Sequence, residues 1–428
     1  MSYIYKFLMK HNFILNFSKY LLISFPILLI SGPFLTDFSG SLIGILIIFY
    51  LVKNKKYEYL NNKFFYFFVI LFFYINLTSF FSEDPFTSFK SSLTYVRLIF
   101  FIFGIAFLIN YYDDLPLRIY QIYFACLLIL FLDSLLIINF NINIFGMQSD
   151  GTSPRIRSLF DDEEIMGSFV SRTVPLIIGI SYYFNHEKIS KYNIIMLMIA
   201  FSLILISAER TAIGNFFIFL FFYFLLERKK LLLVSLILTF IIVIIFQIKQ
   251  ESLNRAINHT ISQSNFNSNK IIFFSLRHTL HYFTAYEIFK DNPVFGAGIK
   301  SFRKLCLNKD YVEKMKSVYG KEMKELQLND GCNTHPHHIY MQFLSEIGII
   351  GFLLFLSIFI FITYNLFVLF KNSLSNSLNN REKVIYFCLV AMFISMFPFL
   401  PSGNYFNNWY IFINYLPIGF YLSNKVRI

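Results

Sequence analysis

Twelve apolar stretches, each near the length of a bilayer-crossing helix, constrain this chain more than any other feature. A helix that spans the hydrocarbon core needs about 20 mostly apolar residues, and its backbone must satisfy its own hydrogen bonds. The stretches lack the alternation of polar and apolar residues that is typical of barrel strands. They cover residues 13–31, 38–52, 63–81, 92–110, 117–139, 166–185, 192–207, 211–226, 230–248, 338–370, 384–400 and 405–424. The sequence therefore predicts an all-α, polytopic membrane protein with about 12 transmembrane helices.

Composition excludes an ordinary soluble protein. Hydrophobic residues make up 56% of the 428 residues and charged residues only 14%, whereas soluble proteins average roughly 25% charged residues. A soluble fold could not cover so much apolar surface with so few charges. The net charge of +12 would also suit a nucleic-acid partner, but the positions of the charges have a simpler explanation.

Lys and Arg residues are distributed unevenly between alternate loops. With the N-terminus placed in the cytoplasm, the inside loops and termini carry 17 of them, and the short outside loops carry only Lys90, Arg155, Arg157 and Arg210. Cytoplasmic loops are the ones enriched in Lys and Arg. Both termini are therefore predicted to be cytoplasmic. The positive charge is thus explained by the membrane topology, and no nucleic-acid partner is expected.

One long polar segment, residues 249–337, separates the ninth and tenth spans and falls on the outside. Within it, Leu276 to Phe289 has apolar residues near helical spacing and stops at the breaker cluster Asp291-Asn292-Pro293. The predicted organisation has three parts. They are nine helices in residues 1–248 with a short outside segment at 140–165, an outer loop at 249–337, and three helices in 338–428.

Two arginines on the outer side are candidates for binding an anion. Arg210 lies in a short polar link between two apolar runs, and Arg277 begins the amphipathic stretch of the outer loop. Arg donates two parallel hydrogen bonds to phosphate oxygens, so the pair suits a lipid diphosphate at the membrane surface. The alternatives are an Arg210 that reaches the lipid headgroups and an Arg277 that is a solvated surface charge.

Three histidines, His335, His337 and His338, directly precede the tenth apolar run. A neutral His is suited to act as a general base near pH 7. A metal site, since imidazole is a common zinc ligand, and helix capping without chemistry are the other interpretations. Only Cys332 lies nearby as a further metal ligand, so we favour the base and expect no metal.

The outer loop also contains Cys306 and Cys332. The outer side of a bacterial membrane permits disulfides, so we expect these two cysteines to pair, with two free thiols as the alternative. Cys126 and Cys388 fall inside apolar runs, where cysteine is a small packing residue. Asp133 and Arg97 also fall inside spans, and we interpret them as polar groups that face the interior of the bundle.

Several of these segments together resemble the O-antigen ligase and O-antigen polymerase superfamily. The resemblance rests on Ser-Ala-Glu-Arg at 207–210, Arg277, Asp-Asn-Pro-Val-Phe-Gly-Ala-Gly at 291–298, and His-Pro-His-His-Ile-Tyr-Met-Gln-Phe-Leu-Ser-Glu-Ile-Gly-Ile-Ile-Gly at 335–351. Twelve spans with a large outer loop before the last motif also match. The family usually has Asn where this chain has His338, which leaves the role of that position open.

The resemblance implies a metal-independent, inverting glycosyltransferase that needs no cofactor. It would be active on the periplasmic face of the bacterial inner membrane. Its donor would be a glycan on undecaprenyl diphosphate. The two clamp arginines of the family carry over to Arg210 and Arg277, and its proposed base carries over to His337. The motif residues that would support the site are His335, His338, Tyr340 and Glu346.

The resemblance leaves the acceptor open. Ligases transfer the finished polysaccharide to lipid A–core, polymerases extend another lipid-linked chain, and related members glycosylate proteins. We favour a ligase, with a polymerase as the alternative. Twelve spans with positive inside loops would also suit a transporter of a polysaccharide or small molecule, but the candidate residues lie outside the membrane rather than at its midplane.

Overall fold

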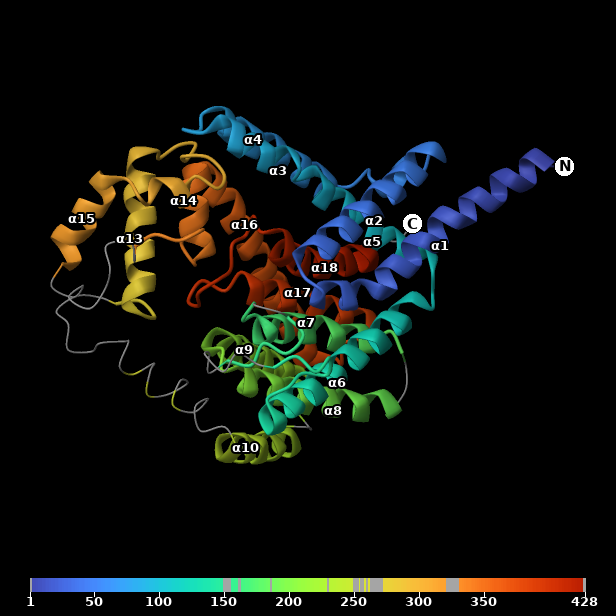
Figure 1. The fold of residues 1–428 in the computed structure, drawn as a ribbon. Helices are drawn as coiled ribbons and strands as arrows, with labels where there is room; N and C mark the ends of the chain where they lie inside the picture. Colours follow the sequence, from blue (N-terminus) through green and yellow to red (C-terminus); the bar gives the residue numbers. More distant parts are fainter. Residues whose placement is uncertain are drawn as a thin grey trace.

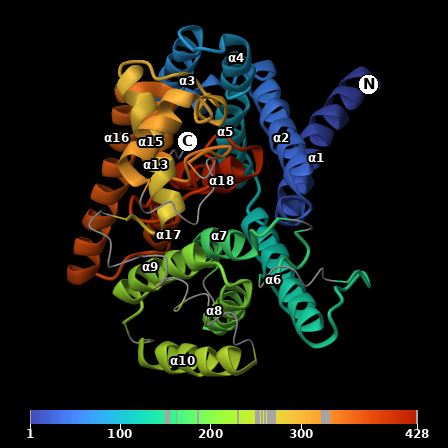
Figure 2. The ribbon, with the colours of Figure 1, turned by 60° about the vertical axis from the view of Figure 1, so that its left-hand side comes forward.

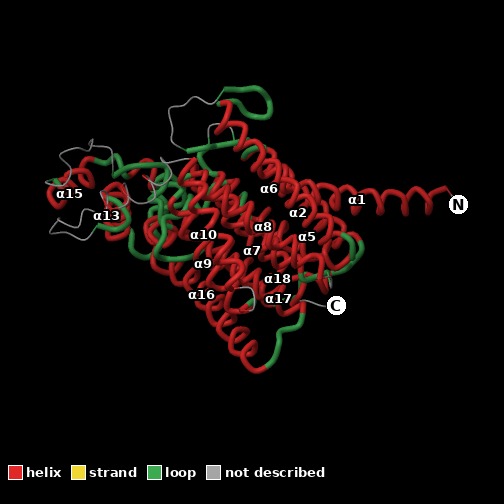
Figure 3. The backbone as a smooth tube through the Cα atoms, turned by 90° about the horizontal axis from the view of Figure 1, so that it is seen from below, coloured by secondary structure: helices red, strands yellow, loops and turns green. Residues whose placement is uncertain are grey.

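The computed structural model describes residues 2–148, 155–160, 163–184, 187–228, 231–248, 272–320 and 331–425, together with residues 254, 258 and 261. Most of these residues are helical, and the only β pairing among them is an isolated bridge between Ile142 and Gln148 (Figure 3). The all-α prediction is thus confirmed. Part of the predicted outer loop, and Asp161 and Asp162 of the outside segment 140–165, lie outside the described residues.

A helix corresponds to each apolar stretch of the sequence. Before the outer loop these are α1 (Ser2–Ile30), α2 (Pro33–Lys53), α3 (Lys63–Phe80), α5 (Val96–Tyr111), α6 (Leu115–Phe140), α7 (Met166–Ser181), α8 (Glu187–Ser207), α9 (Arg210–Leu226) and α10 (Leu231–Ile248). The short polar helix α4 (Pro85–Leu93) and the 3-10 turn η1 (Tyr57–Tyr59) lie between these apolar helices. After the loop follow α16 (Ile339–Ser375), α17 (Asn380–Ser395) and α18 (Asn408–Lys425).

Six of the described helical segments are long and apolar enough to cross a membrane by themselves. These are Phe13–Ile30, Pro33–Lys53, Lys63–Phe80, Pro85–Tyr111, Leu115–Phe140 and Ile339–Ser375. Four shorter apolar helices cover Met166–Ser181, Lys191–Ser207, Arg210–Leu226 and Leu231–Ile245. The chain is therefore a multi-pass membrane protein, whereas the count of twelve spans stays a prediction.

The centre of the bundle is formed by α5, α7, α17 and α18. Most side chains of α5 and α7 are buried, and α18 packs on α5 while α17 packs on α7. By contrast, α3 and α16 leave many apolar side chains exposed, as expected where a helix faces lipid. The longest described helical element, α16, has 37 residues and is interrupted at Gly348. The part after Gly348, residues 349–375, would extend about 40 Å, beyond the roughly 30 Å of hydrocarbon.

The outer loop forms a small helical cap at one side of the bundle. It contains α13 (Leu276–Asp291), α14 (Phe302–Leu305) and α15 (Lys309–Tyr319), and α13 packs on α16. In Figures 1 and 2 this cap lies at the end of the molecule where α16 begins, and α10 lies at the opposite edge. The amphipathic stretch predicted from Leu276 to Phe289 is α13, and this helix ends at the predicted breaker cluster.

Candidate functional site

Four imidazole rings meet between α13 and the segment that leads into α16. The ring centroid of His337 lies 4.1 Å from that of His335, 5.3 Å from that of His281 and 5.6 Å from that of His278. His337 is therefore the central member of this histidine cluster. Within the described part of the chain, no group of three His, Cys, Asp or Glu side chains could hold a metal ion.

His337 adopts a backbone conformation that is rare for a residue with a side chain. Its φ is 54°, a left-handed value that costs of order 1–3 kcal/mol and is typically kept at functional sites. Its carbonyl oxygen accepts a hydrogen bond of 2.9 Å from the amide of Ser402. The side-chain amide nitrogen of Asn333 lies 3.0 Å from Nε2 of His337. An amide nitrogen can only donate, so Nε2 carries the lone pair and faces the exposed Asn333.

The cluster holds its imidazoles neutral. Burial, followed by the nearby His281, lowers the pKa of His337 to about 4. For His278, burial and then His337, His281 and Arg210 lower the pKa to about 3. Burial and the adjacent His337 also lower the pKa of His335 far below its ordinary value. These rings therefore carry no proton charge at neutral pH, which is the protonation state from which a general base acts.

Arg210 lies close to the cluster because the turn between α8 and α9 is anchored to a third helix. The buried carboxylate of Glu209 accepts hydrogen bonds from the amides of Gly167 and Ser168, at 2.6 and 3.2 Å, and from the Ser168 hydroxyl at 2.7 Å. These amides belong to the first turn of α7, whose amides lack partners within the helix. Glu209 thus sets the position at which α9 begins with Arg210.

The guanidinium of Arg210 stacks on the segment that carries Arg277. Its central carbon lies 5.0 Å from the ring centroid of Phe274, and the Phe274 ring lies 5.1 Å from that of His278. Arg277 is exposed in the first turn of α13, directly before His278. The fold therefore brings Arg210 and the start of α13 together although they are distant in the sequence.

His338 begins α16 and serves as its N-cap. Its Nδ1 accepts a hydrogen bond from the amide of Met341, and its Nε2 donates to the carbonyl of Pro398 at 2.9 Å. Tyr340 donates from its hydroxyl to the carbonyl of Met396 at 2.8 Å. Both residues thus attach the start of α16 to the segment after α17. Asn is among the best N-cap residues, which explains how His can replace it here.

We expect His338→Ala to destabilise the protein by about 1 kcal/mol, because the first turn of α16 loses its cap. His338→Asn should retain most of the stability, since its amide oxygen can accept from the same backbone amide. Thermal unfolding of the two purified variants beside the unmodified protein measures the difference. Equal destabilisation by Ala and Asn would show that the cap contributes little.

Two of the sequence motifs bind to each other through their backbones. In α16, Gly348 leaves the helix with φ 70° and ψ −173°, and the segment 293–298 pairs with the chain at this break. The amides of Ala297 and Gly298 donate to the carbonyls of Ser345 and Glu346, both at 2.9 Å, and the amide of Ile349 donates to Pro293, also at 2.9 Å. Residues 291–298, called the docking segment below, thus bind the outer loop to α16.

Glu346 is completely buried beside this docking point. Its carboxylate accepts from the Gln342 side-chain amide at 3.1 Å, and the same nitrogen lies 2.7 Å from Oδ1 of Asn404. A buried carboxylate needs such partners. Glu346 therefore contributes to the junction of α16 with the segment before α18 rather than to the histidine cluster itself.

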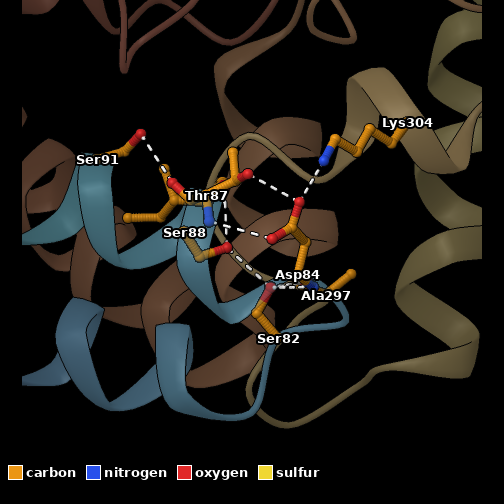
Figure 4. A network of polar contacts seen from close by, with 8 residues as sticks. Ser82, Asp84, Thr87, Ser88, Ser91, Ala297 and Lys304 are labelled. Carbon is orange, nitrogen blue, oxygen red and sulfur yellow. Dashed lines mark hydrogen bonds and ion pairs between the residues drawn. The ribbon is translucent and has the colours of Figure 1, made fainter.

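The other side of the docking segment is bound by the turn between α3 and α4 (Figure 4). The hydroxyl of Ser82 donates to the carbonyl of Ala297 at 3.0 Å, and that of Ser88 donates to Ile299 at 3.1 Å. Lys304 forms an ion pair with Asp84, and this contact, together with hydrogen bonds from Thr87, lowers the pKa of Asp84 to about 2. Residues 297–304 are thus held on two sides.

Cys306 and Cys332 are joined in a disulfide, with their Cα atoms 5.0 Å apart. This is the pairing that the sequence predicts. It attaches the segment before His335 to the end of α14, whose first residues follow the docking segment. Cys126 and Cys388 are buried free thiols.

The charged residues expected to face the bundle interior have structural partners. Arg97 of α5 forms a salt bridge of 2.8 Å with Asp37 of α2. Asp133 accepts from the amide of Ile144 at 2.7 Å and from the hydroxyl of Ser158 at 2.5 Å. In the outside segment 140–165, Arg155 and Arg157 lie 2.8 and 3.8 Å from the carboxylate of Glu164.

Sequence reasoning missed four residues of this region. His278 and His281 are three positions apart on one helix, a spacing that places side chains on the same face and could have indicated a joint role. Arg172 and Arg303 line a cavity that also contains His335. Arg172 lies inside an apolar run, and an ionisable residue in such a position is a functional candidate by itself. Arg303 had no comparable signal in the sequence.

Comparison with known families places these motifs in a single domain. The family model described as O-antigen ligase matches residues 195–356, which include Arg210, the histidine cluster, the docking segment and the break in α16. No curated protein matches the chain. The matched residues contain the motifs on which the resemblance rests, and the match at residues 195–356 supports the O-antigen ligase and polymerase superfamily.

Proposed function

We propose that this protein transfers a glycan from undecaprenyl diphosphate to a hydroxyl acceptor, as an inverting, metal-independent ligase on the periplasmic face of the inner membrane. The observation that carries the proposal is the arrangement around His337. A strained, neutral imidazole whose Nε2 faces the exposed Asn333 lies in contact with the start of α13, and Arg210 lies against the same segment.

In the proposed reaction, His337 takes the proton of the acceptor hydroxyl while the oxygen attacks the anomeric carbon of the donor sugar. The bond between that carbon and the diphosphate oxygen breaks at the same time, and a single displacement inverts the anomeric centre. Negative charge grows on the departing diphosphate. Arg210 and Arg277 stabilise this charge, which is the role of preorganised donors in group transfer. The proton on His337 then passes to solvent.

The acceptor in this proposal is lipid A–core. A polymerase would instead take a second lipid-linked repeat. A transfer assay with the purified protein, one labelled lipid-diphosphate glycan and each acceptor in turn tests the proposal. Transfer to lipid A–core supports a ligase, transfer only to the lipid-linked repeat supports a polymerase, and transfer to neither contradicts a glycosyltransferase.

We expect Arg210→Lys and Arg277→Lys each to reduce transfer by at least about tenfold, because Lys cannot form the two parallel hydrogen bonds that Arg offers to a diphosphate. The loss should appear in the KM for the donor as well as in kcat. Arg228→Lys is a matched control, since Arg228 lies just beyond the opposite end of α9. Normal transfer by both clamp variants would leave the arginines without a role in binding the donor.

The pH dependence follows from the lowered pKa of His337. An imidazole with an unperturbed pKa of 6.5 would lose its activity as a base below that pH, whereas His337 in the free enzyme stays neutral down to about pH 4. We therefore expect kcat/KM, which reports the free enzyme, to change little between about pH 5 and 7. Initial rates across this range measure it, and a decline centred near pH 6.5 would contradict the prediction.

A further inference from the structure

A cavity of about 450 Å³ lies next to the histidine cluster. His335 lines it, and the ring of His335 is 4.1 Å from that of His337. The cavity is also lined by two cations, Arg172 and Arg303, by the aromatic residues Trp409 and Tyr410, and by the amide side chain of Asn404. It therefore combines charge, aromatic surface and hydrogen-bonding groups beside the proposed base.

Arg172 is the most unusual residue of this cavity. It comes from α7 and is only 4% exposed, yet no carboxylate among the described residues forms a salt bridge with it. Its guanidinium stacks on Tyr410 at 5.0 Å and donates one bond of 3.3 Å to the carbonyl of Ser168, while its Nε has no hydrogen-bond partner. A buried charge without a counter-charge is costly, so this one is available for an anion.

Arg303 reaches the same cavity from a firmly held segment. Its neighbour Lys304 is paired with Asp84, and the backbone before it is docked on α16. The Nε of Arg303 also has no hydrogen-bond partner, and within the described residues the side chain forms no salt bridge. Glu346 lies near enough to interact with it electrostatically but does not pair with it.

Carboxylates around the cavity do not neutralise these cations. Glu163 lines the cavity but is exposed, and Glu164 is bound by Arg155 and Arg157. The two guanidinium groups thus give the cavity a net positive character. An arginine fork fits a carboxylate or a phosphate. The Oδ1 of Asn404 already accepts from Gln342 and from the amide of Phe406, so Asn404 can offer its side-chain NH₂ group to a sugar hydroxyl.

We propose that this cavity is an acceptor subsite that binds a sugar with an acidic group, a carboxylate or a phosphate. The inference rests on the proposed transfer function and adds the chemical class of the acceptor. Arg172 and Arg303 bind the acidic group, Trp409 and Tyr410 contact the faces of the sugar, and the neighbouring hydroxyl is presented towards the histidine cluster. The donor diphosphate is bound separately, at Arg210 and Arg277.

The chain itself contains a probe for this cavity, because Trp409 is its only tryptophan. We would titrate the purified protein with glucose 6-phosphate, with galacturonate and with their neutral counterparts glucose and galactose, and follow the fluorescence of Trp409. At least one acidic sugar is expected to bind at least about tenfold more tightly than its neutral counterpart, since bonds to a charged group are the stronger ones. Which of the two binds distinguishes phosphate from carboxylate.

Variants separate this site from the donor site. Arg172→Gln and Arg303→Gln should abolish the preference for the acidic sugar, whereas Arg210→Gln should retain it. Because Arg172 is buried, the thermal stability of each variant is measured as well. If Arg172→Gln does not fold, Arg303→Gln alone tests the prediction. In the transfer assay, the KM for the acceptor should rise in these two variants while donor binding stays unchanged.

Several results would overturn the inference. These are equal binding of acidic and neutral sugars, an unchanged preference in both cavity variants, or loss of acidic-sugar binding in Arg210→Gln. Binding of glycerol 3-phosphate as tightly as glucose 6-phosphate would reject a sugar site in favour of a phospholipid headgroup. The binding assay needs no turnover, so a failure of the proposed transfer reaction would be recognised separately.

Discussion

His337→Ala is expected to reduce glycan transfer by roughly 10²- to 10⁴-fold, the usual contribution of a positioned general base. An acceptor hydroxyl is a weak nucleophile unless its proton is removed as the new bond forms. His337 is suited to this step because its ring stays neutral, its Nε2 carries the lone pair, and its backbone is fixed by Ser402. The measurement is single-turnover transfer at saturating donor, with donor binding determined in parallel.

Two neighbouring histidines are the matched controls. His338→Asn keeps the cap of α16 and should retain nearly full turnover. His335→Ala should raise the KM for the acceptor more than it lowers kcat, because His335 lines the cavity rather than occupying the centre of the cluster. Wild-type turnover in His337→Ala would mean that another residue is the base. Loss of turnover only in His335→Ala would indicate that His335, which lines the cavity, is the base.

Gly348→Ala and Gly296→Ala are each expected to destabilise the protein by roughly 3 kcal/mol or more, from a left-handed backbone and an overpacked contact together. Their φ values are 70° and 71°. A Cβ on Gly348 would lie 2.2 Å from the carbonyl oxygen of Val294, and one on Gly296 would lie 2.4 Å from the backbone of Glu346 and Ile347. Backbone atoms cannot move aside as a side chain can, so the docking of segment 293–298 on α16 would be lost.

Gly146→Ala separates the cost of the left-handed backbone from the cost of the overpacked contact. Its φ of 77° is similarly left-handed, but no atom lies within 4 Å of a Cβ built there. We expect it to cost only about 1 kcal/mol, the penalty of the backbone conformation. Thermal unfolding in detergent compares the three variants. Equal losses in all three would mean that the close backbone contact between the two motifs adds nothing to stability.

Individual helices could be predicted from the sequence because each depends mainly on local composition. An apolar run in lipid must satisfy its backbone internally, so the runs became helices wherever the structure describes them. The outer-loop helix α13 was likewise predicted, since its apolar spacing and the breaker cluster after it are local signals. The number of helices that cross the membrane was less accessible, because several are shorter than the bilayer and depend on their neighbours.

A helical membrane protein could be recognised from local composition alone, and the motifs indicated His337 and Arg210 as candidates. The surroundings of these residues depend on contacts between remote parts of the chain. Burial, followed by His281 of α13, lowers the pKa of His337, and Glu209 positions Arg210 by capping α7.

The cavity likewise could not be predicted from the sequence. Arg172, Arg303 and Trp409 come from α7, α14 and α18, and nothing in their local sequence connects them. Helix formation is decided within a few residues of the chain. Burial, electrostatic environment and cavity shape are decided by elements that are remote in sequence, and these are the quantities that give a side chain its chemistry.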